Sequence, residues 1–219
     1  MADRRALVLL RHARTAWNLE RRIQGHLDAG LDETGHGQAR AAAKEIAAHR
    51  PALLWSSDLS RATGTAAYIG EACGLEVVTD PRLREYHLGA MQGRTYAEVA
   101  ETDPGAFERF RRGDFEADDG ESTAEVGARV AEALRELLDA TPPGRMSVAV
   151  SHGAAIRVGL AEVVGWGAPL GLTLGALVNC GWAVLTEVEP NGRLRLNSYN
   201  RMAASVDAQA DFASPPSVG

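Results

Sequence analysis

The chain has 219 residues with 23 basic and 29 acidic side chains, and its formal net charge of −6 disfavours nucleic acid as a partner, because duplex binding needs excess cationic charge. Residues 1–5 lead into only five apolar residues, too few for a signal sequence or a membrane span. Cys73 and Cys180 fit neither a disulfide framework nor a zinc site, so we expect a cytoplasmic protein with no membrane partner.

The first half of the chain alternates strand-like and helix-like stretches. The apolar run 6–10 predicts a first strand, and a polar loop leads from it to 34–49, where alanine and isoleucine recur on one helical face. The run 52–56 predicts a second strand, followed by a helix that ends at Gly74. A short third strand is expected at 75–78.

The second half begins with 83–120, which is rich in glycine and charge and predicts an insertion of loops and short helices. A Ser-x-x-Glu capping box at 122–125 precedes a long amphipathic helix. The run 146–151 predicts a fourth strand with another helix behind it. Residues 176–188 and 193–198 predict a closing antiparallel pair around a Pro-Asn-Gly turn.

Strands that alternate with helices predict a three-layer α/β/α sandwich with a mainly parallel sheet. We expect residues 1–202 to form one catalytic domain. Residues 203–219 end in a stretch rich in serine and proline that has little to bury, which predicts a mobile tail. In sheets of this kind, ligands bind beyond the carboxyl ends of the strands.

Two of the predicted parallel strands end in a histidine. His12 follows 6–10 and His152 follows 146–151, so both should reach the same edge of the sheet. Either one alone would be interpreted as an ordinary solvated strand-end histidine. Arg11 beside His12, and Arg61 at the start of a helix, add guanidinium groups that match phosphate oxygens in pairs. The four side chains together predict a site for a tetrahedral dianion, and phosphate is the natural candidate.

Other phosphate chemistry is disfavoured. The chain lacks a Gly-x-x-x-x-Gly-Lys loop and has no aspartate cluster suited to magnesium, which argues against ATP-dependent transfer. The other four histidines lack the spacing of a metal site and are interpreted as loop or helix-surface residues: His26, His36, His49 and His87. We therefore expect no metal and no cofactor.

The segment 10–18 resembles the Arg-His-Gly-x-Thr-x-Trp-Asn motif of the histidine phosphatase superfamily, also called the phosphoglycerate mutase-like family. Ala13 replaces the usual glycine, and Gly64 stands where glutamine often follows the second arginine. Both departures could reshape the pocket, but neither removes a catalytic group. The resemblance covers nearly the whole chain except the tail and continues through 25–28, 31–35, 56–62, 83–85, 120–122 and 150–153.

The resemblance implies a phosphomonoesterase that works through a phosphohistidine. His12 would be the nucleophile, and its imidazole must be neutral to attack, which the adjacent arginines favour by repelling a second positive charge. Arg11, Arg61 and His152 would bind the phosphoryl oxygens. Glu85, after the third strand, would protonate the departing alkoxide and later activate water.

Several further residues have weaker assignments. Asn18 and Gln24 are expected to contact phosphoryl oxygens, although a loop residue that satisfies local backbone also accounts for Gln24. Three arginines could meet a second anionic group, but a solvated basic turn explains them better: Arg109, Arg111 and Arg112. Three aromatic residues could line the pocket or pack the insertion onto the sheet: Trp17, Tyr86 and Tyr96.

The expected substrate is a small phosphorylated metabolite, bound by a monomer or a homodimer. Segments 56–59, 83–89 and 193–200 resemble those of actinobacterial glucosyl-3-phosphoglycerate phosphatases, and the arginine-rich composition with a single lysine suits a G+C-rich bacterium. A cofactor-dependent phosphoglycerate mutase is the alternative within the family. Glu85 and His152 are only 67 positions apart, shorter than in most mutases, which favours an open, hydrolytic site. A catalytically silent binding or regulatory module is a third possibility, disfavoured because the five catalytic positions are intact.

Overall fold

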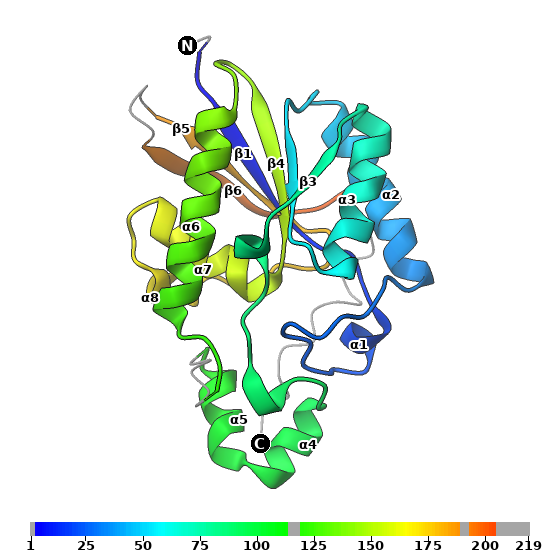
Figure 1. Ribbon diagram of the computed structural model, residues 1–219, viewed down its shortest axis with the longest axis vertical. Coiled ribbons are helices and arrows are strands. Elements are labelled where there is room, and N and C mark those ends of the chain that lie inside the picture. Colours follow the sequence, from blue (N-terminus) through cyan, green and yellow to red (C-terminus); the bar gives the residue numbers. More distant parts are fainter. Residues whose placement is uncertain (1–2, 114–118, 189–192, 205–219) are drawn as a thin grey trace.

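The computed structural model describes residues 3–113, 119–188 and 193–204, which contain one six-stranded sheet in the order β3-β2-β4-β1-β5-β6 (Figure 1). Four neighbouring strands are parallel: β3 (Val77–Thr79), β2 (Leu54–Ser56), β4 (Met146–Ser151) and β1 (Ala6–Arg11). β5 (Trp182–Glu187) is antiparallel to β1, and β6 (Leu194–Arg201) is antiparallel to β5. The sheet is therefore mixed, with its parallel part at the centre and one edge.

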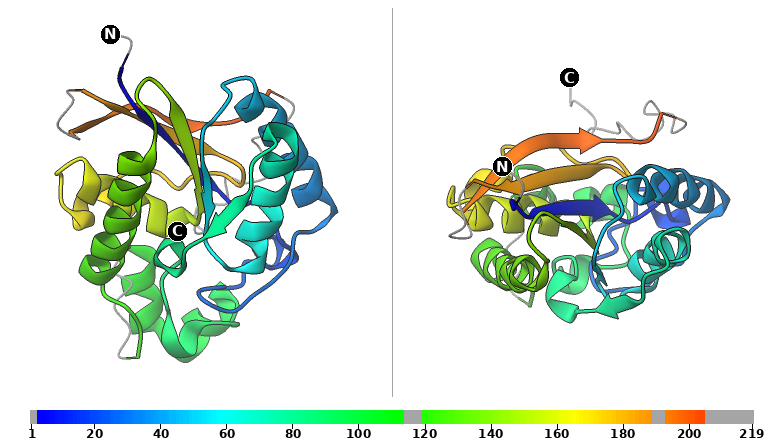
Figure 2. Two further views of the ribbon diagram at one scale, coloured as in Figure 1. Left: turned by 45° about the horizontal axis from the view of Figure 1, so that its top comes forward. Right: turned by 90° about the horizontal axis from the view of Figure 1, so that it is seen from above.

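The side chains of β1 alternate between two apolar layers. Leu7 and Leu9 pack with α6 (Thr123–Ala140) and α7 (Gly153–Val163). Val8 and Leu10 pack with α2 (Glu33–Ala47) and α3 (Ser60–Cys73). Helices thus cover both faces of the sheet (Figure 2), and the three-layer α/β/α sandwich expected from the sequence is confirmed.

The predicted insertion is a set of short elements. η1 (Pro81–Leu83) leads into it, and its described residues form η2 (Gly89–Met91), α4 (Tyr96–Thr102) and α5 (Pro104–Arg111). Figure 1 shows α4, α5 and the short α1 (Ala16–Leu19) at the end of the molecule toward which the parallel strands run. The insertion therefore stands over the edge of the sheet where ligands are expected.

Local signals located most helices well and strand ends less well. Ser122 and Glu125 form the expected capping box, and Gly74 ends α3 with a left-handed φ of 66°. β3 starts at Val77 rather than at residue 75, because the Leu75 N–H still bonds to the Gly70 carbonyl and closes α3.

The closing pair is shorter than predicted at its start. β5 begins at Trp182, because the preceding residues turn: Cys180 has a φ of 55° and the Gly181 N–H bonds to the Val178 carbonyl. Between 163 and 182 lies α8 (Ala168–Gly171), a short helix that the sequence patterns did not predict. The predicted turn at 190–192 and the tail from 205 onward lie outside the described residues.

Candidate active site

β1 and β4 end side by side at the carboxyl edge of the sheet. Arg11 pairs with Ser151 in the parallel register, and the His12 N–H continues the ladder with a hydrogen bond of 2.9 Å to the Ser151 carbonyl. The residues that follow each strand therefore meet, and the ring centroids of His12 and His152 are 5.2 Å apart. The structure brings together the two histidines that the sequence placed at one edge.

His12 is buried in a neutral form. Only 4% of its surface is exposed, and its Nδ1 lies 2.7 Å from the Ala13 carbonyl. A carbonyl can only accept, so Nδ1 carries the proton and Nε2 carries the lone pair. Burial is the main reason that the pKa of His12 lies well below its usual value, and the charges of Arg61 and Arg11 lower it further. From the sequence, only the adjacent arginines were expected to keep the His12 imidazole neutral.

Arg61, in the first turn of α3, is 1% exposed and held by backbone carbonyls. Its Nη2 donates to the Gly25 carbonyl at 2.7 Å and its Nη1 to the Leu27 carbonyl at 2.8 Å. Burial lowers the pKa of Arg61 to about 10, so the guanidinium remains cationic at neutral pH. Its Nη1 also lies 3.8 Å from the Asp28 carboxylate, and the side chain lines the same pocket as His12.

His152 is fully buried between two side chains. Arg61 Nε donates to its Nδ1 at 3.2 Å, so in the neutral ring Nε2 carries the proton and donates to Ser57 Oγ at 2.9 Å. Burial, followed by the charge of Arg61, holds the pKa of His152 well below its usual value. Ser57 was not predicted as a site residue, although it lies directly after the second strand and within the family-like segment 56–62.

The other expected phosphate ligands surround the same pocket, which Arg11, Asn18 and Gln24 line. Arg11 Nη1 donates to the Leu177 carbonyl. Asn18 Oδ1 accepts from the Thr15 N–H at 3.0 Å to cap α1, so its amide nitrogen is the group it can offer to an anion. Gln24 Oε1 is buried and has no hydrogen-bond partner among the described residues, and a half-turn of its amide brings Nε2 to the same position.

The Glu85 carboxylate sits on the N-terminus of α7. It accepts hydrogen bonds from the N–H groups of Ala154 at 3.1 Å, Ala155 at 2.9 Å and Tyr86 at 3.1 Å. The first N–H groups of a helix have no partner within the helix and favour negative charge, so this is a natural seat for a carboxylate. Because His152 is the N-cap of the same helix, the seat places Glu85 in the wall of the pocket that also holds His12.

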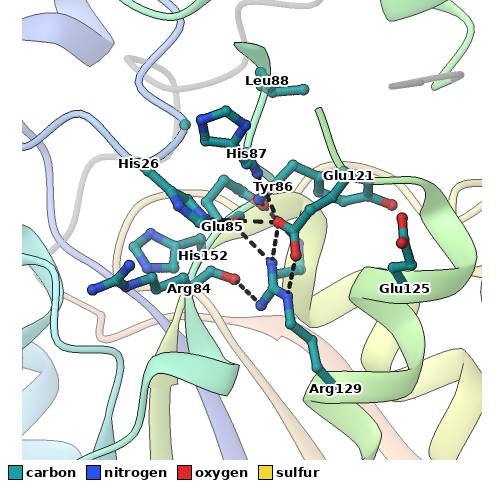
Figure 3. Close-up of polar contacts among 12 residues, drawn as sticks. His26, Arg84, Glu85, Tyr86, His87, Leu88, Glu121, Glu125, Arg129 and His152 are labelled. Carbon is teal, nitrogen blue, oxygen red and sulfur yellow. Dashed lines mark hydrogen bonds and ion pairs between the residues drawn. The ribbon is translucent and has the colours of Figure 1, made fainter. Parts of the chain in front are cut away.

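A further arginine, Arg129 on α6, holds the backbone that carries Glu85 (Figure 3). It donates to the carbonyls of Arg82 at 2.8 Å, Arg84 at 2.7 Å and Glu85 at 2.8 Å. The same guanidinium makes a paired contact with both Glu121 oxygens, at 2.7 and 2.8 Å. We call this arrangement the Arg129 clamp. Sequence reasoning missed it, since no local spacing links residue 129 to carbonyls more than forty positions earlier.

Two of the histidines expected on the surface lie beside this clamp. His26 is half-buried with Nε2 at 2.9 Å from the Glu85 carbonyl, and its ring packs edge-on against His87 at 5.2 Å. Burial is the largest cause of the lowered pKa of His26. His36 and His49 are exposed on or beside α2, as expected.

Apolar and aromatic residues also line the pocket. Tyr86 and Tyr96 line it together with Leu88, Phe110 and Leu177, whereas Trp17 does not. The three arginines of the insertion are exposed, as expected for solvated residues, but they lie at the end of a helix rather than on a turn, since Arg109 and Arg111 are in the last turn of α5 and Arg112 is its C-cap. Arg111 pairs with Glu108 at 3.1 Å and Arg112 with the same carboxylate at 3.8 Å. The residues that depart from the family motif, Ala13 and Gly64, are not among the lining residues.

Comparison with known proteins shows which family the chain belongs to. A family model described as "Histidine phosphatase superfamily (branch 1)" matches residues 7–201. The chain belongs to the histidine phosphatase superfamily. The motif-based resemblance is thereby confirmed, and the chain is a phosphomonoester hydrolase, as the sequence predicted.

Individual relatives of this superfamily member carry different names. The glucosyl-3-phosphoglycerate phosphatase of Mycobacterium tuberculosis is 40% identical over 195 residues, which cover 83% of this chain and 85% of that protein. A probable phosphoglycerate mutase of Serratia proteamaculans is 38% identical over 163 residues, covering 72% and 74%. The solved structure of mycobacterial glucosyl-3-phosphoglycerate phosphatase with VO3 has a TM-score of 0.83 at 37% identity and covers 90% of this chain and 99% of that one.

The described residues were also compared with what a membrane span, a metal site and a disulfide require. Among the residues that the structure describes, no helix combines the length and apolarity needed to cross a bilayer. The same residues include no group of three or more His, Cys, Asp or Glu side chains arranged to hold a metal ion. Cys73 has a free thiol.

Proposed function

We propose that the chain hydrolyses a phosphomonoester through a phosphohistidine at His12, without a metal or an organic cofactor. The observation that carries the proposal is the state of His12. Its ring is buried and neutral, its proton is held on Nδ1 by the Ala13 carbonyl, and its lone pair is on Nε2 beside two cationic arginines. A neutral nucleophile flanked by positive charge suits attack on a phosphate dianion.

In the first step, the Nε2 lone pair of His12 forms a bond to phosphorus while the bond from phosphorus to the ester oxygen breaks. Arg11 and Arg61 bind the phosphoryl oxygens, which gather charge as the bonds change. Glu85, protonated at this stage, gives its proton to the departing oxygen and an alcohol is released. His152 contributes its Nε2–H once the hydrogen bond to Ser57 is exchanged for one to a phosphoryl oxygen.

In the second step, water attacks the phosphohistidine. The Glu85 carboxylate takes a proton from this water, the bond between phosphorus and Nε2 breaks, and inorganic phosphate leaves with His12 again neutral. The N–H groups of Ala154 and Ala155 keep the Glu85 side chain in one place through both steps, and the negative charge that they favour helps the acid to give up its proton in the first step. Such fixed placement of a proton donor is a large part of its catalytic effect.

The Arg129 clamp leads to a prediction about positioning. Arg129→Lys removes the fork that holds three carbonyls, so kcat for alkyl phosphates should fall about 10- to 100-fold with little change in KM, because Glu85 moves relative to the leaving oxygen. Steady-state kinetics of the variant measure this. Arg135→Lys, an exposed position on the same helix, is the matched control and should behave as wild type.

The positioning role is separated from a purely structural one by a double variant. If Arg129 acts through Glu85, then Arg129→Lys should add little to the loss already caused by Glu85→Gln. Losses that multiply in the double variant would show that the clamp acts elsewhere.

For the substrate, we propose glucosyl-3-phosphoglycerate. The support comes from relatives that bear this name, in sequence over most of both chains and in structure at a TM-score of 0.83. The apolar and aromatic residues that line the pocket beside the expected phosphate ligands suit an ester larger than a simple sugar phosphate. A screen of phosphorylated metabolites that includes phosphoglycerates, sugar phosphates and glucosyl-3-phosphoglycerate tests the assignment, and a clear preference for another ester would replace it.

Hydrolysis should exceed mutase activity by a wide margin. A mutase must return its phosphoryl group to a bound glycerate before water arrives, so it needs a lid that excludes solvent. Glu85 and His152 are only 67 positions apart, and the described residues between them supply as helices just the short η2, α4, α5 and α6. We expect release of inorganic phosphate to outpace interconversion of 3- and 2-phosphoglycerate, with or without 2,3-bisphosphoglycerate. Faster isomerisation than hydrolysis of every ester in the panel would establish the mutase instead.

The silent-module alternative is disfavoured by the same site, since Arg11, His12, Arg61 and Glu85 line one pocket. His152 is not among the lining residues, but it contacts Arg61 and its ring lies 5.2 Å from that of His12. We further propose a cytoplasmic location, in keeping with a chain that has only two cysteines and with the free thiol of Cys73.

A further inference from the structure

One cationic side chain at the pocket has no part in the phosphoryl chemistry. Arg157 lies on α7 one helical turn after Gly153 and lines the same pocket as His12 and Glu85. A helical turn rises about 5.4 Å, and helical side chains lean toward the N-terminus of their helix. The Arg157 guanidinium is therefore placed beyond the phosphoryl end of the pocket and reaches back toward it.

The guanidinium of Arg157 is held but not neutralised. Its Nη1 donates to the Leu174 carbonyl at 3.1 Å, whereas its buried Nε has no hydrogen-bond partner within the described ranges. No carboxylate of the described residues lies within ion-pair distance of it either. A buried N–H of a cation is costly to leave unmet, so the position calls for an acceptor that carries negative charge.

Two other arginines that line the pocket, Arg22 and Arg11, have contacts within the protein. Arg22 pairs with Glu20 at 3.0 Å and donates to the Gly93 carbonyl. Arg11 is tied to the Leu177 carbonyl and Arg157 to the Leu174 carbonyl, so a single loop sets the spacing between these two guanidinium groups. The chain thus holds a second positive charge at a fixed offset from the phosphate ligands.

We propose that Arg157 binds a carboxylate of the substrate, attached to the carbon skeleton close to the phosphorylated carbon. A single guanidinium balances one negative charge and its fork matches a planar carboxylate, whereas a second phosphate dianion would bring twice that charge. Leu88, Tyr96 and Phe110 line the same pocket, and their low-polarity surroundings strengthen such a pair. The proposal rests on hydrolysis at His12 and does not depend on the glucosyl group.

A pair of substrates with the same carbon skeleton tests this subsite. 3-Phosphoglycerate and glycerol 3-phosphate differ in having a carboxylate or a hydroxymethyl group at the far carbon. The wild-type enzyme should show the higher kcat/KM for 3-phosphoglycerate. Arg157→Met, which keeps length but removes the charge, should lower kcat/KM for 3-phosphoglycerate about 10- to 100-fold, mainly through KM. Activity on glycerol 3-phosphate and p-nitrophenyl phosphate should stay within about twofold.

Two further variants control for folding and for charge alone. Arg157→Lys keeps a positive charge but not the fork, so its loss on 3-phosphoglycerate should fall between wild type and Arg157→Met. Arg135→Met removes an exposed arginine from α6 and should leave the substrate ratio unchanged. Equal losses of Arg157→Met on all three substrates would mean that Arg157 supports the fold, and the subsite proposal would be wrong.

The outcome also separates this proposal from the proposed function. Wild-type hydrolysis of p-nitrophenyl phosphate without preference for the carboxylated ester would overturn the subsite and leave the phosphatase standing. If no ester were hydrolysed, the proposed function would fail, and calorimetric binding of the same two esters to wild type and Arg157→Met would decide the subsite. Tighter binding of 3-phosphoglycerate that disappears in the variant supports it, and equal binding of both esters refutes it.

Discussion

His12→Ala is expected to reduce hydrolysis of every phosphomonoester by at least about 10⁴-fold, because the phosphohistidine cannot form without the imidazole. The ring is buried and its pKa is well below the usual value, so wild-type His12 is ready to attack throughout the neutral range without prior loss of a proton. Initial rates on p-nitrophenyl phosphate and on the best substrate of the panel measure the loss. Circular dichroism of the variant confirms that the fold survives removal of one buried ring.

Two observations accompany that result. Wild-type enzyme quenched in base during turnover of a labelled ester should carry label on His12, since phosphohistidine survives base and is cleaved by acid, and the variant should carry none. Chelators should leave wild-type activity intact. Undiminished activity in His12→Ala, or complete loss of wild-type activity with a chelator, would rule out this mechanism.

Glu85→Gln should separate substrates by their leaving groups. Alkoxides of sugars and glycerate leave poorly, so loss of the acid should lower kcat for their esters about 10²- to 10⁴-fold, whereas p-nitrophenolate leaves unaided and its ester should be affected far less. Steady-state kinetics on both ester classes measure the difference. Similar losses on both would indicate that Glu85 positions the substrate or that another group supplies the proton.

The seat of Glu85 makes this variant a fair test. Oε1 accepts from Ala155 and Tyr86 and Oε2 from Ala154, so the single oxygen of glutamine can keep the first two hydrogen bonds and loses only the third. A variant that retains its activity on p-nitrophenyl phosphate therefore has an intact phosphoryl site. Under those conditions the loss on alkyl esters reports the missing proton.

Much of the fold was readable from local patterns. The apolar run of β1, the capping box at Ser122 and Glu125, and the glycine stop at residue 74 each act over a few positions, and each appears in the structure as expected. Parallel strands end at a common edge, so the pairing of His12 with His152 also followed from strand ends alone. Hydrogen bonds between residues a few positions apart depend on the local spacing of residue types, so the sequence could predict them.

The chain by itself therefore determined its layered fold and its family, and it predicted the reactive groups that the proposed mechanism uses. Only the tertiary structure decided the protonation state of those groups and the contacts that hold them. Burial of His12, the carbonyls of Gly25 and Leu27 around Arg61, and the Arg129 clamp all join segments far apart in the sequence. Desolvation depends on everything that packs around a group, and a backbone carbonyl offers the same acceptor at every residue. Neither leaves a local pattern, so both are settled only when the chain has folded.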